Sequence, residues 1–127
     1  MQVVILAGGL GTRLSEETVN VPKPMVRIGQ DPIIVHLMKY YASYGHNEFV
    51  ICLGYKGEVI KEYFLNYFAL HSDMTIDLKD NIVNVSDTSC EEFKISLIDT
   101  GLETMTAGRL KRVEKYLNNE AFLLTYG

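Results

Sequence analysis

The sequence predicts an α/β fold: a Rossmann-like three-layer sandwich with a mostly parallel central sheet and a small β-hairpin insertion. Short apolar runs rich in β-branched residues alternate with apolar stripes at helical spacing. This strand, helix, strand, helix order favours parallel strands joined by crossover helices. The first run ends in a cluster of glycines, as a buried strand often does. Two shorter runs around a polar turn in the middle of the chain predict the hairpin.

The N-terminal half of the chain supplies two strands with a helix between them. Residues 2–7 form the first predicted strand and residues 49–53 the second. We expect the helix to begin at Pro32, with Asp31 as its N-cap, and to stop at Gly45. Its apolar stripe consists of Ile33, Ile34, Leu37, Met38 and Tyr41.

A second helix carries a stripe that is largely aromatic. Its members are Val59, Ile60, Tyr63, Phe64, Tyr67 and Phe68. A stripe at this spacing is far more often core than a ligand-binding surface, so we predict that it packs against the sheet.

The C-terminal half departs from the strict alternation of strands and helices. Residues 74–78 and 82–85 predict the hairpin, and residues 94–98 a further strand. A last helix is expected over residues 106–117, followed by a closing buried strand over residues 121–125.

Composition and charge exclude several classes of function. The chain has 127 residues and a net charge of −4, which argues against a nucleic-acid partner because a phosphate backbone calls for a basic face. No apolar run approaches the ~20 residues that cross a bilayer, so no membrane partner is expected. The N-terminal run is too short, and too soon interrupted by glycine, to be a signal peptide. These features predict a cytoplasmic protein.

Neither cysteine nor histidine residues show metal-binding or redox spacing. Cys52 lies within an apolar run and is predicted to be a buried, inert thiol, and Cys90 has no partner at a redox or ligand spacing. The three histidines are interpreted as structural or surface residues. They are His36, His46 and His71.

The glycine-rich turn after the first strand is suited to binding phosphate. Gly8, Gly9 and Gly11 remove the side chains that would keep an anion away from the backbone N–H groups. Thr12 adds a hydroxyl donor, and Arg13 adds a fork of donors that matches phosphate oxygens.

Two familiar phosphate loops do not fit this turn. A Walker A loop ends in Gly-Lys-Ser/Thr, whereas this chain has Gly11-Thr12-Arg13. A dinucleotide fingerprint needs a further glycine at the position of Leu14, and an acidic residue at the end of the second strand, where this chain has Leu53-Gly54.

Lys23 is held between two prolines twelve residues after Gly11. Pro22 and Pro24 stiffen the backbone around it, which favours a side chain that must meet a reacting phosphate. Alone, the pattern would fit an ordinary turn with a solvated lysine. Together with the upstream loop it predicts phosphoryl-group chemistry.

These two motifs together resemble the signature of the sugar nucleotidyltransferases, the enzymes that make activated sugars. The stretch 7–14 followed by residues 22–25 carries the resemblance. Further stretches narrow it to the cytidylyl branch of the family. They are residues 54–57, 60–64, 99–101 and 105–113. The resemblance covers essentially the whole chain and implies the nucleotide-diphospho-sugar transferase fold.

The resemblance also implies a reaction. Members of this branch transfer CMP from CTP to glucose 1-phosphate, giving CDP-glucose and pyrophosphate, with Mg²⁺ as the cofactor. The partners implied are a nucleoside triphosphate and a sugar 1-phosphate, in nucleotide-sugar and polysaccharide biosynthesis. A homo-oligomer is implied for the full-length protein.

By the same resemblance, residues of this chain take nucleotide-binding roles. They are Leu6, Ala7, Gly8, Gly9, Leu10, Gly11, Thr12, Arg13, Lys23, Thr104, Arg109 and Gly127. Arg13 and Lys23 are the implied catalytic residues, the first holding the leaving pyrophosphate and the second meeting the phosphate at the reacting centre. Arg109 has an alternative interpretation: it could belong to one solvated basic face together with Lys111, Arg112 and Lys115.

The sequence departs from the family pattern in two places. Ala107 stands where family members often have glycine. The chain also stops at Gly127, where the family continues with an aspartate that helps to hold magnesium, and a second metal aspartate lies far downstream. We therefore expect residues 1–127 to be a truncated nucleotide-binding part, without metal ligands or the sugar-binding part, and inactive alone. A thymidylyl-, uridylyl- or guanylyltransferase, or a non-catalytic nucleotide-binding module, stays open as an alternative.

Overall fold

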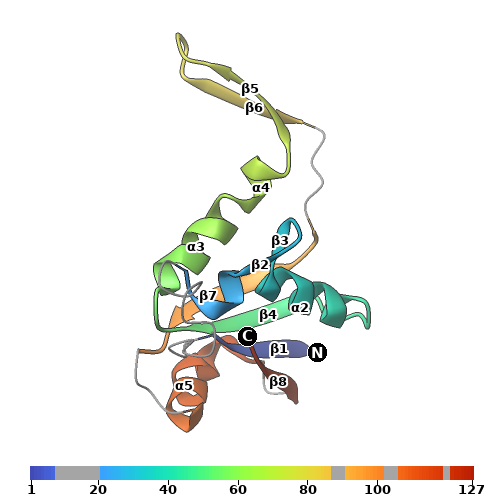
Figure 1. Cartoon of the computed structure of the whole chain (residues 1–127), viewed down its shortest axis with the longest axis vertical. Coiled ribbons are helices and arrows are strands. Elements are labelled where there is room, and N and C mark those ends of the chain that lie inside the picture. Colours follow the sequence, from blue (N-terminus) through green and yellow to red (C-terminus); the bar gives the residue numbers. More distant parts are fainter. Residues whose placement is uncertain (8–20, 87–90, 102–105, 119–120) are drawn as a thin grey trace.

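A parallel β-sheet forms the centre of the structure (Figure 1). The computed structural model describes residues 1–7, 21–86, 91–101, 106–118 and 121–127. Within these residues the sheet has the order β7 (Lys94–Asp99), β4 (Glu48–Leu53), β1 (Gln2–Ala7) and β8 (Phe122–Tyr126). Every pair of neighbours is parallel, as the sequence predicts.

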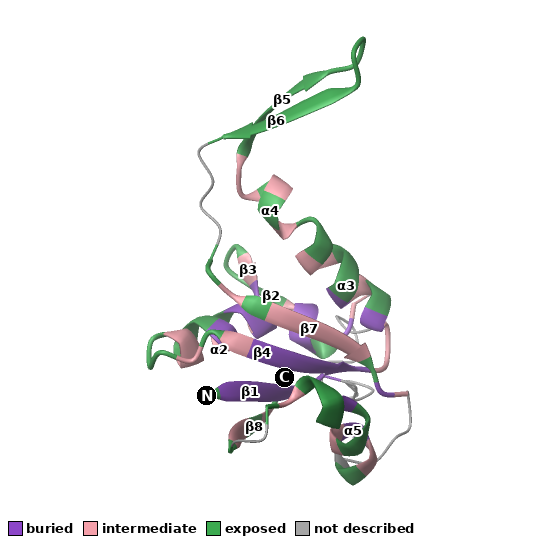
Figure 2. Ribbon diagram, turned by 180° about the vertical axis from the view of Figure 1, so that it is seen from behind, coloured by how far each residue is buried: buried purple, intermediate pink, exposed green. Residues whose placement is uncertain are grey.

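Helices cover both faces of the sheet and make three layers (Figure 2). Because side chains alternate along a strand, Ile5 and Ile51 lie in a core with α2 (Ile33–Ala42) and α3 (Gly57–Leu65). Their neighbours on the other face pack against α5 (Thr106–Val113). Those neighbours are Val4, Leu6, Val50 and Cys52. The predicted three-layer α/β architecture and the buried Cys52 are confirmed.

The start of α2 differs from the prediction. Asp31 and Pro32 form β3, a two-residue strand paired with β2 (Arg27–Ile28), so the helix begins one residue later, at Ile33. Pro32 takes the N-cap position, and its ring cannot accept a capping hydrogen bond. The predicted cap Asp31 is therefore wrong, and its carboxylate instead accepts a 3.1 Å hydrogen bond from Lys39 Nζ.

The aromatic stripe divides between two helices. It continues from α3 into the short α4 (Tyr67–Leu70), with Asn66 between them. Ile60 is fully buried, but Phe68 is 53% exposed. The prediction of a continuous core stripe is wrong at this end because α4 extends beyond the sheet (Figure 1).

The predicted hairpin is present and extends away from the sheet (Figure 1). It consists of β5 (Asp73–Asp77) and β6 (Ile82–Ser86), which pair antiparallel. The turn places Asn81 at a φ of 55°, a left-handed conformation that asparagine tolerates. Asp77 Oδ1 accepts hydrogen bonds from the backbone N–H groups of Lys79 and Asp80, at 3.0 and 3.2 Å.

The last helix is shorter than predicted, and the last strand is more exposed than predicted. The final helix ends at Val113 and continues as a single 3₁₀ turn, η3 (Glu114–Tyr116). The predicted burial of residues 121–125 is wrong in part, because Leu124 on β8 is 43% exposed. Among the described residues, none of the helices is long and apolar enough to span a membrane.

Candidate functional site

The carboxyl ends of the sheet strands meet at one edge of the molecule. The pairing places Ala7, Leu53 and Asp99 side by side at the ends of β1, β4 and β7. In open α/β sheets ligands bind at this edge. The predicted site residues Leu6 and Ala7 lie here, whereas residues 8–13 and Thr104 lie outside the described residues.

Gly127 lies at this edge, next to the end of β1. Its N–H donates a 3.1 Å hydrogen bond to the carbonyl oxygen of Leu6. A Cβ added to Gly127 would lie 3.2 Å from Cγ2 of Ile5 and 3.3 Å from Cγ of Pro24. Both distances are tighter than ordinary contacts, so glycine permits the close approach of three segments.

Lys23 sits on the third of these segments. The 3₁₀ turn η2 (Lys23–Met25) is closed by hydrogen bonds from Met25 N–H to Pro22 O at 2.9 Å and from Val26 N–H to Lys23 O at 3.1 Å. Pro24 and Met25 are buried, while Lys23 is exposed. A buried turn therefore holds an exposed ammonium group at the edge where the glycine-rich loop begins.

Arg109 approaches from the other face of the sheet. It lies on α5 and is only 8% exposed, whereas its neighbours Lys111 and Arg112 are exposed. Burial raises the pKa of the Cys52 thiol to about 11, and the Arg109 guanidinium opposes that shift, which places the two side chains near each other. Arg109 is thus not part of a solvated basic face, and it stands across the sheet from the turn that carries Lys23.

Sequence reasoning missed the residue that ties β7 to β4 at this edge. Thr100 is fully buried, and its backbone N–H and its hydroxyl both donate 2.9 Å hydrogen bonds to the carbonyl oxygen of Leu53. Next to it, Asp99 pairs with Lys61 at 2.9 Å. The stretch 99–101 carried part of the family resemblance, but only the fold reveals its partner.

The described residues do not supply a recognisable metal site. Across the ranges given above, histidine, cysteine, aspartate and glutamate do not gather in groups of three or more that could hold an ion. The described residues therefore do not identify a set of ligands for Mg²⁺.

Comparison with known proteins decides the family. The family described as nucleotidyl transferase matches residues 2–121. The chain belongs to the nucleotidyl transferase family.

Two curated relatives in this family match along the whole chain. The chain is 56% identical to a glucose-1-phosphate cytidylyltransferase of Salmonella typhimurium strain LT2, over 100% of this chain and 50% of that protein. It is 50% identical to a probable glucose-1-phosphate cytidylyltransferase of Bacillus subtilis strain 168, with the same coverage. The chain thus spans about half the length of the curated relatives it matches.

A solved structure of a nucleotidyl transferase relative supports the fold. HddC from Yersinia pseudotuberculosis, complexed with GMP-PN, superposes with a TM-score of 0.65 at 32% identity, over 98% of this chain and 46% of that one. The parallel sheet described above is the half of the nucleotide-diphospho-sugar transferase fold that the two chains share.

Proposed function

We propose that the complete protein transfers CMP from CTP to glucose 1-phosphate, giving CDP-glucose and pyrophosphate. The observation that carries the proposal is the 56% identity, over all of this chain, to a protein named for that activity. Residues 1–127 would be the nucleotide-binding part of the enzyme, because they correspond to half of that relative.

The proposed reaction needs positioning and charge neutralisation rather than a covalent enzyme intermediate. A phosphate oxygen of glucose 1-phosphate attacks the α-phosphorus of CTP, and the bond from that phosphorus to the bridging oxygen breaks as pyrophosphate leaves. We assign the cradle for the triphosphate to the backbone of Gly8, Gly9 and Gly11 and to the Thr12 hydroxyl. Arg13 would hold the leaving pyrophosphate.

Lys23 and Arg109 would approach the nucleotide from opposite faces of the sheet. Support for Lys23 comes from its exposed side chain on a buried turn that packs against Gly127. A charge that is already fixed in place stabilises a transition state without reorganisation. Support for Arg109 comes from its burial on α5.

The remaining features of the proposal concern the complete protein. Mg²⁺ would neutralise charge on the phosphates, with its aspartate ligands outside residues 1–127. We place the enzyme in the cytoplasm, in nucleotide-sugar and polysaccharide biosynthesis, as a homo-oligomer with neither nucleic-acid nor membrane partners.

A guanylyltransferase is the second candidate. It is favoured by one observation: the HddC structure, at 32% identity, is described as a complex with GMP-PN. The identity to the cytidylyltransferases is higher, so CTP remains the first choice.

Pyrophosphate release tests the proposal directly. The product of the complete reading frame is assayed with glucose 1-phosphate and Mg²⁺ against CTP, GTP, UTP and dTTP. We expect the highest kcat/KM with CTP. Preference for GTP, UTP or dTTP would reassign the base, and binding of CTP without pyrophosphate release would indicate a nucleotide-binding module.

A pair of lysine variants tests the assigned site in the same assay. Lys23→Ala is expected to lower kcat/KM by about 100-fold or more, because one positioned charge is removed from the reacting phosphate. Lys111→Ala removes an exposed lysine on α5 and serves as the matched control, with activity unchanged. Equal activity of the two variants would remove Lys23 from the site.

A further inference from the structure

Two consecutive residues fix the carboxyl end of β7 to its neighbours. Asp99, the last residue of the strand, pairs with Lys61 on α3 at 2.9 Å. Thr100 donates two 2.9 Å hydrogen bonds to the carbonyl oxygen of Leu53, one from its backbone N–H and one from its hydroxyl. Thr100 is fully buried, whereas the side chains of Lys61 and Asp99 are 46% and 70% exposed. Only the contact made by Thr100 is therefore shielded from water.

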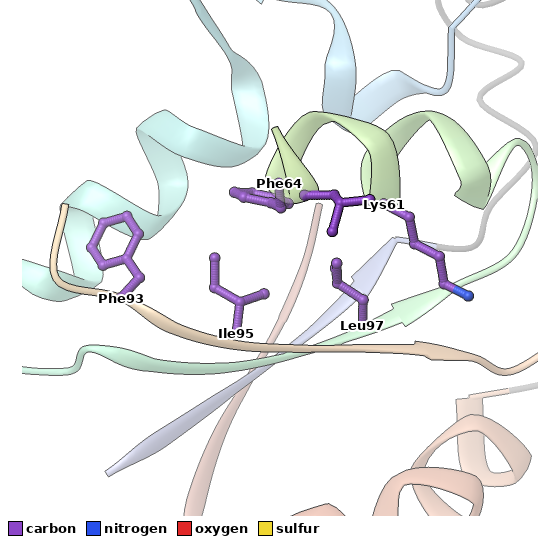
Figure 3. A pocket seen from close by; sticks show the side chains of 6 residues that line it. Lys61, Phe64, Phe93, Ile95 and Leu97 are labelled. Carbon is purple, nitrogen blue, oxygen red and sulfur yellow. The ribbon is translucent and has the colours of Figure 1, made fainter. Parts of the chain in front are cut away.

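The exposed ion pair contributes little to holding the strand. The Lys61 side chain extends past Leu97 toward the carboxyl end of β7, at the end of the apolar groove between α3 and this strand (Figure 3). Ion pairs between exposed side chains are screened by water and contribute little to stability. The buried hydroxyl of Thr100 is thus the side-chain contact that holds the end of β7 to β4.

Thr100 lies on the face of the sheet that α5 covers. Side chains alternate between the two faces of a strand, and Ile98 packs in the core on the α5 side. The next residue, Asp99, contacts α3 on the opposite face. Thr100 continues this alternation, so its side chain is on the same face as that of Ile98.

Arg109 lies on that face too, close to the same edge of the sheet. It belongs to α5 and is 8% exposed. Burial raises the pKa of the Cys52 thiol, and the charge of Arg109 opposes that rise. Because charges act strongly only over short distances, Arg109 lies near Cys52, the residue before Leu53 in β4. Thr100 and Arg109 therefore approach the end of β4 from the neighbouring strand and from the helix that covers it.

The chain has a short path from one residue to the other. Gly101 has a φ of 96°, a left-handed conformation that favours glycine and sets the direction in which the chain leaves β7. Since α5 begins at Thr106, only residues 102–105 connect it to Gly101. So short a connection limits where a helix can begin relative to the end of a strand. A shift at Thr100 would therefore be transmitted to the start of α5 and to Arg109.

We infer that Thr100 is a positioning residue for nucleotide binding, because its hydroxyl fixes the end of β7 to β4 and thereby sets the position of Arg109. The inference rests on the proposed function, in which Arg109 approaches the nucleotide from the α5 face. A misplacement of about 1 Å at a reacting site can lower a rate about 100-fold. Thr100 is itself fully buried, so it acts through Arg109 and not by contact with the nucleotide.

Thr100→Val removes the hydroxyl and keeps the shape of the side chain. The Leu53 carbonyl retains its hydrogen bond from the backbone N–H, so the variant is expected to fold. A methyl group cannot take the place of the hydroxyl at 2.9 Å from the carbonyl oxygen, because such carbon–oxygen contacts are about 3.3–3.6 Å. The end of β7 must therefore shift by about half an ångström.

Steady-state kinetics of the complete reading-frame product separate positioning from stability. We expect Thr100→Val to raise the KM for CTP about 10-fold and to change kcat less than about 3-fold, because Arg109 would hold the nucleotide both before and during the reaction. Thr100→Ser keeps a hydroxyl and should have a KM within about 2-fold of that of the parent. A merely structural threonine would lower the folded fraction, which lowers the apparent kcat and leaves KM unchanged. That result would overturn the inference.

Lys61→Ala is the matched control at the same end of the strand. It removes the exposed ion pair with Asp99 and should change the KM for CTP less than about 2-fold. An equal rise of KM in Lys61→Ala and Thr100→Val would show that the hydroxyl has no special part, and would reject the inference.

A double-mutant cycle tests whether Thr100 acts through Arg109. In the Arg109→Ala background, adding Thr100→Val should change the KM for CTP less than about 2-fold, because the side chain that Thr100 positions is gone. Effects of the two substitutions that multiply would mean that they act independently, which contradicts the inference.

Amide hydrogen exchange gives a readout that does not depend on the proposed activity. Without nucleotide, the amides of α5 should exchange about 5-fold faster in Thr100→Val than in Thr100→Ser, the factor that loss of one net hydrogen bond gives. Equal exchange rates would overturn the link between the end of β7 and α5. A parent protein that releases pyrophosphate from none of the four triphosphates would reject the proposed function, and the exchange rates would still decide whether Thr100 holds α5.

Discussion

Gly57 begins α3 directly against the end of β4. A Cβ added there would lie 2.9 Å from Cβ of Leu53, closer than real Cβ contacts allow. Alanine would favour the helix by less than about 1 kcal/mol at this first position, whereas overpacking a rigid contact costs about 1–3 kcal/mol. We therefore expect Gly57→Ala to lower the free energy of unfolding by about 1–2 kcal/mol.

Urea unfolding of the Gly57 variant measures this difference. Glu58→Ala, at the next and exposed position of the same helix, is the control and should change stability by less than about 0.5 kcal/mol. A Gly57→Ala protein as stable as its parent would show that α3 can shift away from β4.

Cys52 makes the stability of the fold depend on pH in the alkaline range. Burial raises the pKa of its thiol from 9.0 to about 11 despite the opposing charge of Arg109. The folded state therefore holds this proton more tightly than the unfolded state, so stability is fully present below pH 9 and falls as the pH rises through 11. We therefore expect the urea midpoint to fall as the pH rises from 9 to 11, the interval between the pKa values of the unfolded and folded states.

Two measurements isolate the thiol from other groups that titrate in this range. Cys52→Ala should lose less stability at alkaline pH than its parent does. With Cys90→Ser, the folded protein at pH 8 should react at least about 100-fold more slowly with a thiol reagent than in urea, because two pKa units reduce the thiolate 100-fold. Similar rates in both conditions would mean that the thiol is accessible.

At the scale of elements, one side chain fastens η3 to the first strand. Gln2 is 5% exposed; its Nε2 donates to Tyr116 O at 2.9 Å, and its Oε1 accepts from Asn118 N–H at 2.8 Å. Gln2→Leu would leave both backbone groups without this partner, which we expect to lower the free energy of unfolding by about 2–3 kcal/mol.

Comparison with a carboxylate separates the two hydrogen bonds. Gln2→Glu keeps an acceptor for Asn118 but removes the donor to Tyr116, so its stability at pH 7 should not exceed that of its parent. Equal stability of Gln2→Leu and its parent, measured by urea unfolding, would show that water replaces both bonds.

The strands were the elements best predicted from sequence. The buried strands β1 and β4 agree to within a residue, because a strand covered on both faces has a continuous apolar run. The two-residue strands β2 and β3 have too few residues for any periodicity, and they displaced the expected start of α2. Exposure of Phe68 depends on where the sheet ends, which local sequence does not encode.

The position of the candidate site along the sheet could be predicted from the sequence, but not the arrangement of its side chains. Glycine-rich turns follow strand ends, so the sequence could assign Ala7 and Gly127 to the carboxyl edge. The face from which each helix approaches is a tertiary property. For that reason Arg109 could be assigned to the candidate site from the family motif, but its burial could not be predicted.

At the scale of the whole molecule, the carboxyl edge of the sheet lies between two layers of helices. The turn with Lys23 packs in the core shared with α2 and α3, and Arg109 lies in the layer of α5. A ligand at this edge would lie between cations that are held by separate cores. A substitution in one layer should therefore disturb one of the two contacts and leave the other in place.

The β5–β6 hairpin and the central strands should differ in amide hydrogen exchange. Amides of β1 and β4 lie in strands paired on both sides, so they exchange only when the whole domain unfolds. Those of β5 and β6 are bonded only within the hairpin and should open locally, orders of magnitude faster, in a monomer.

One native-state exchange experiment compares both sets of amides. If β5 and β6 were as strongly protected as β1 and β4, the hairpin would open only when the whole domain unfolds, and its separation from the two cores would not lower its local stability.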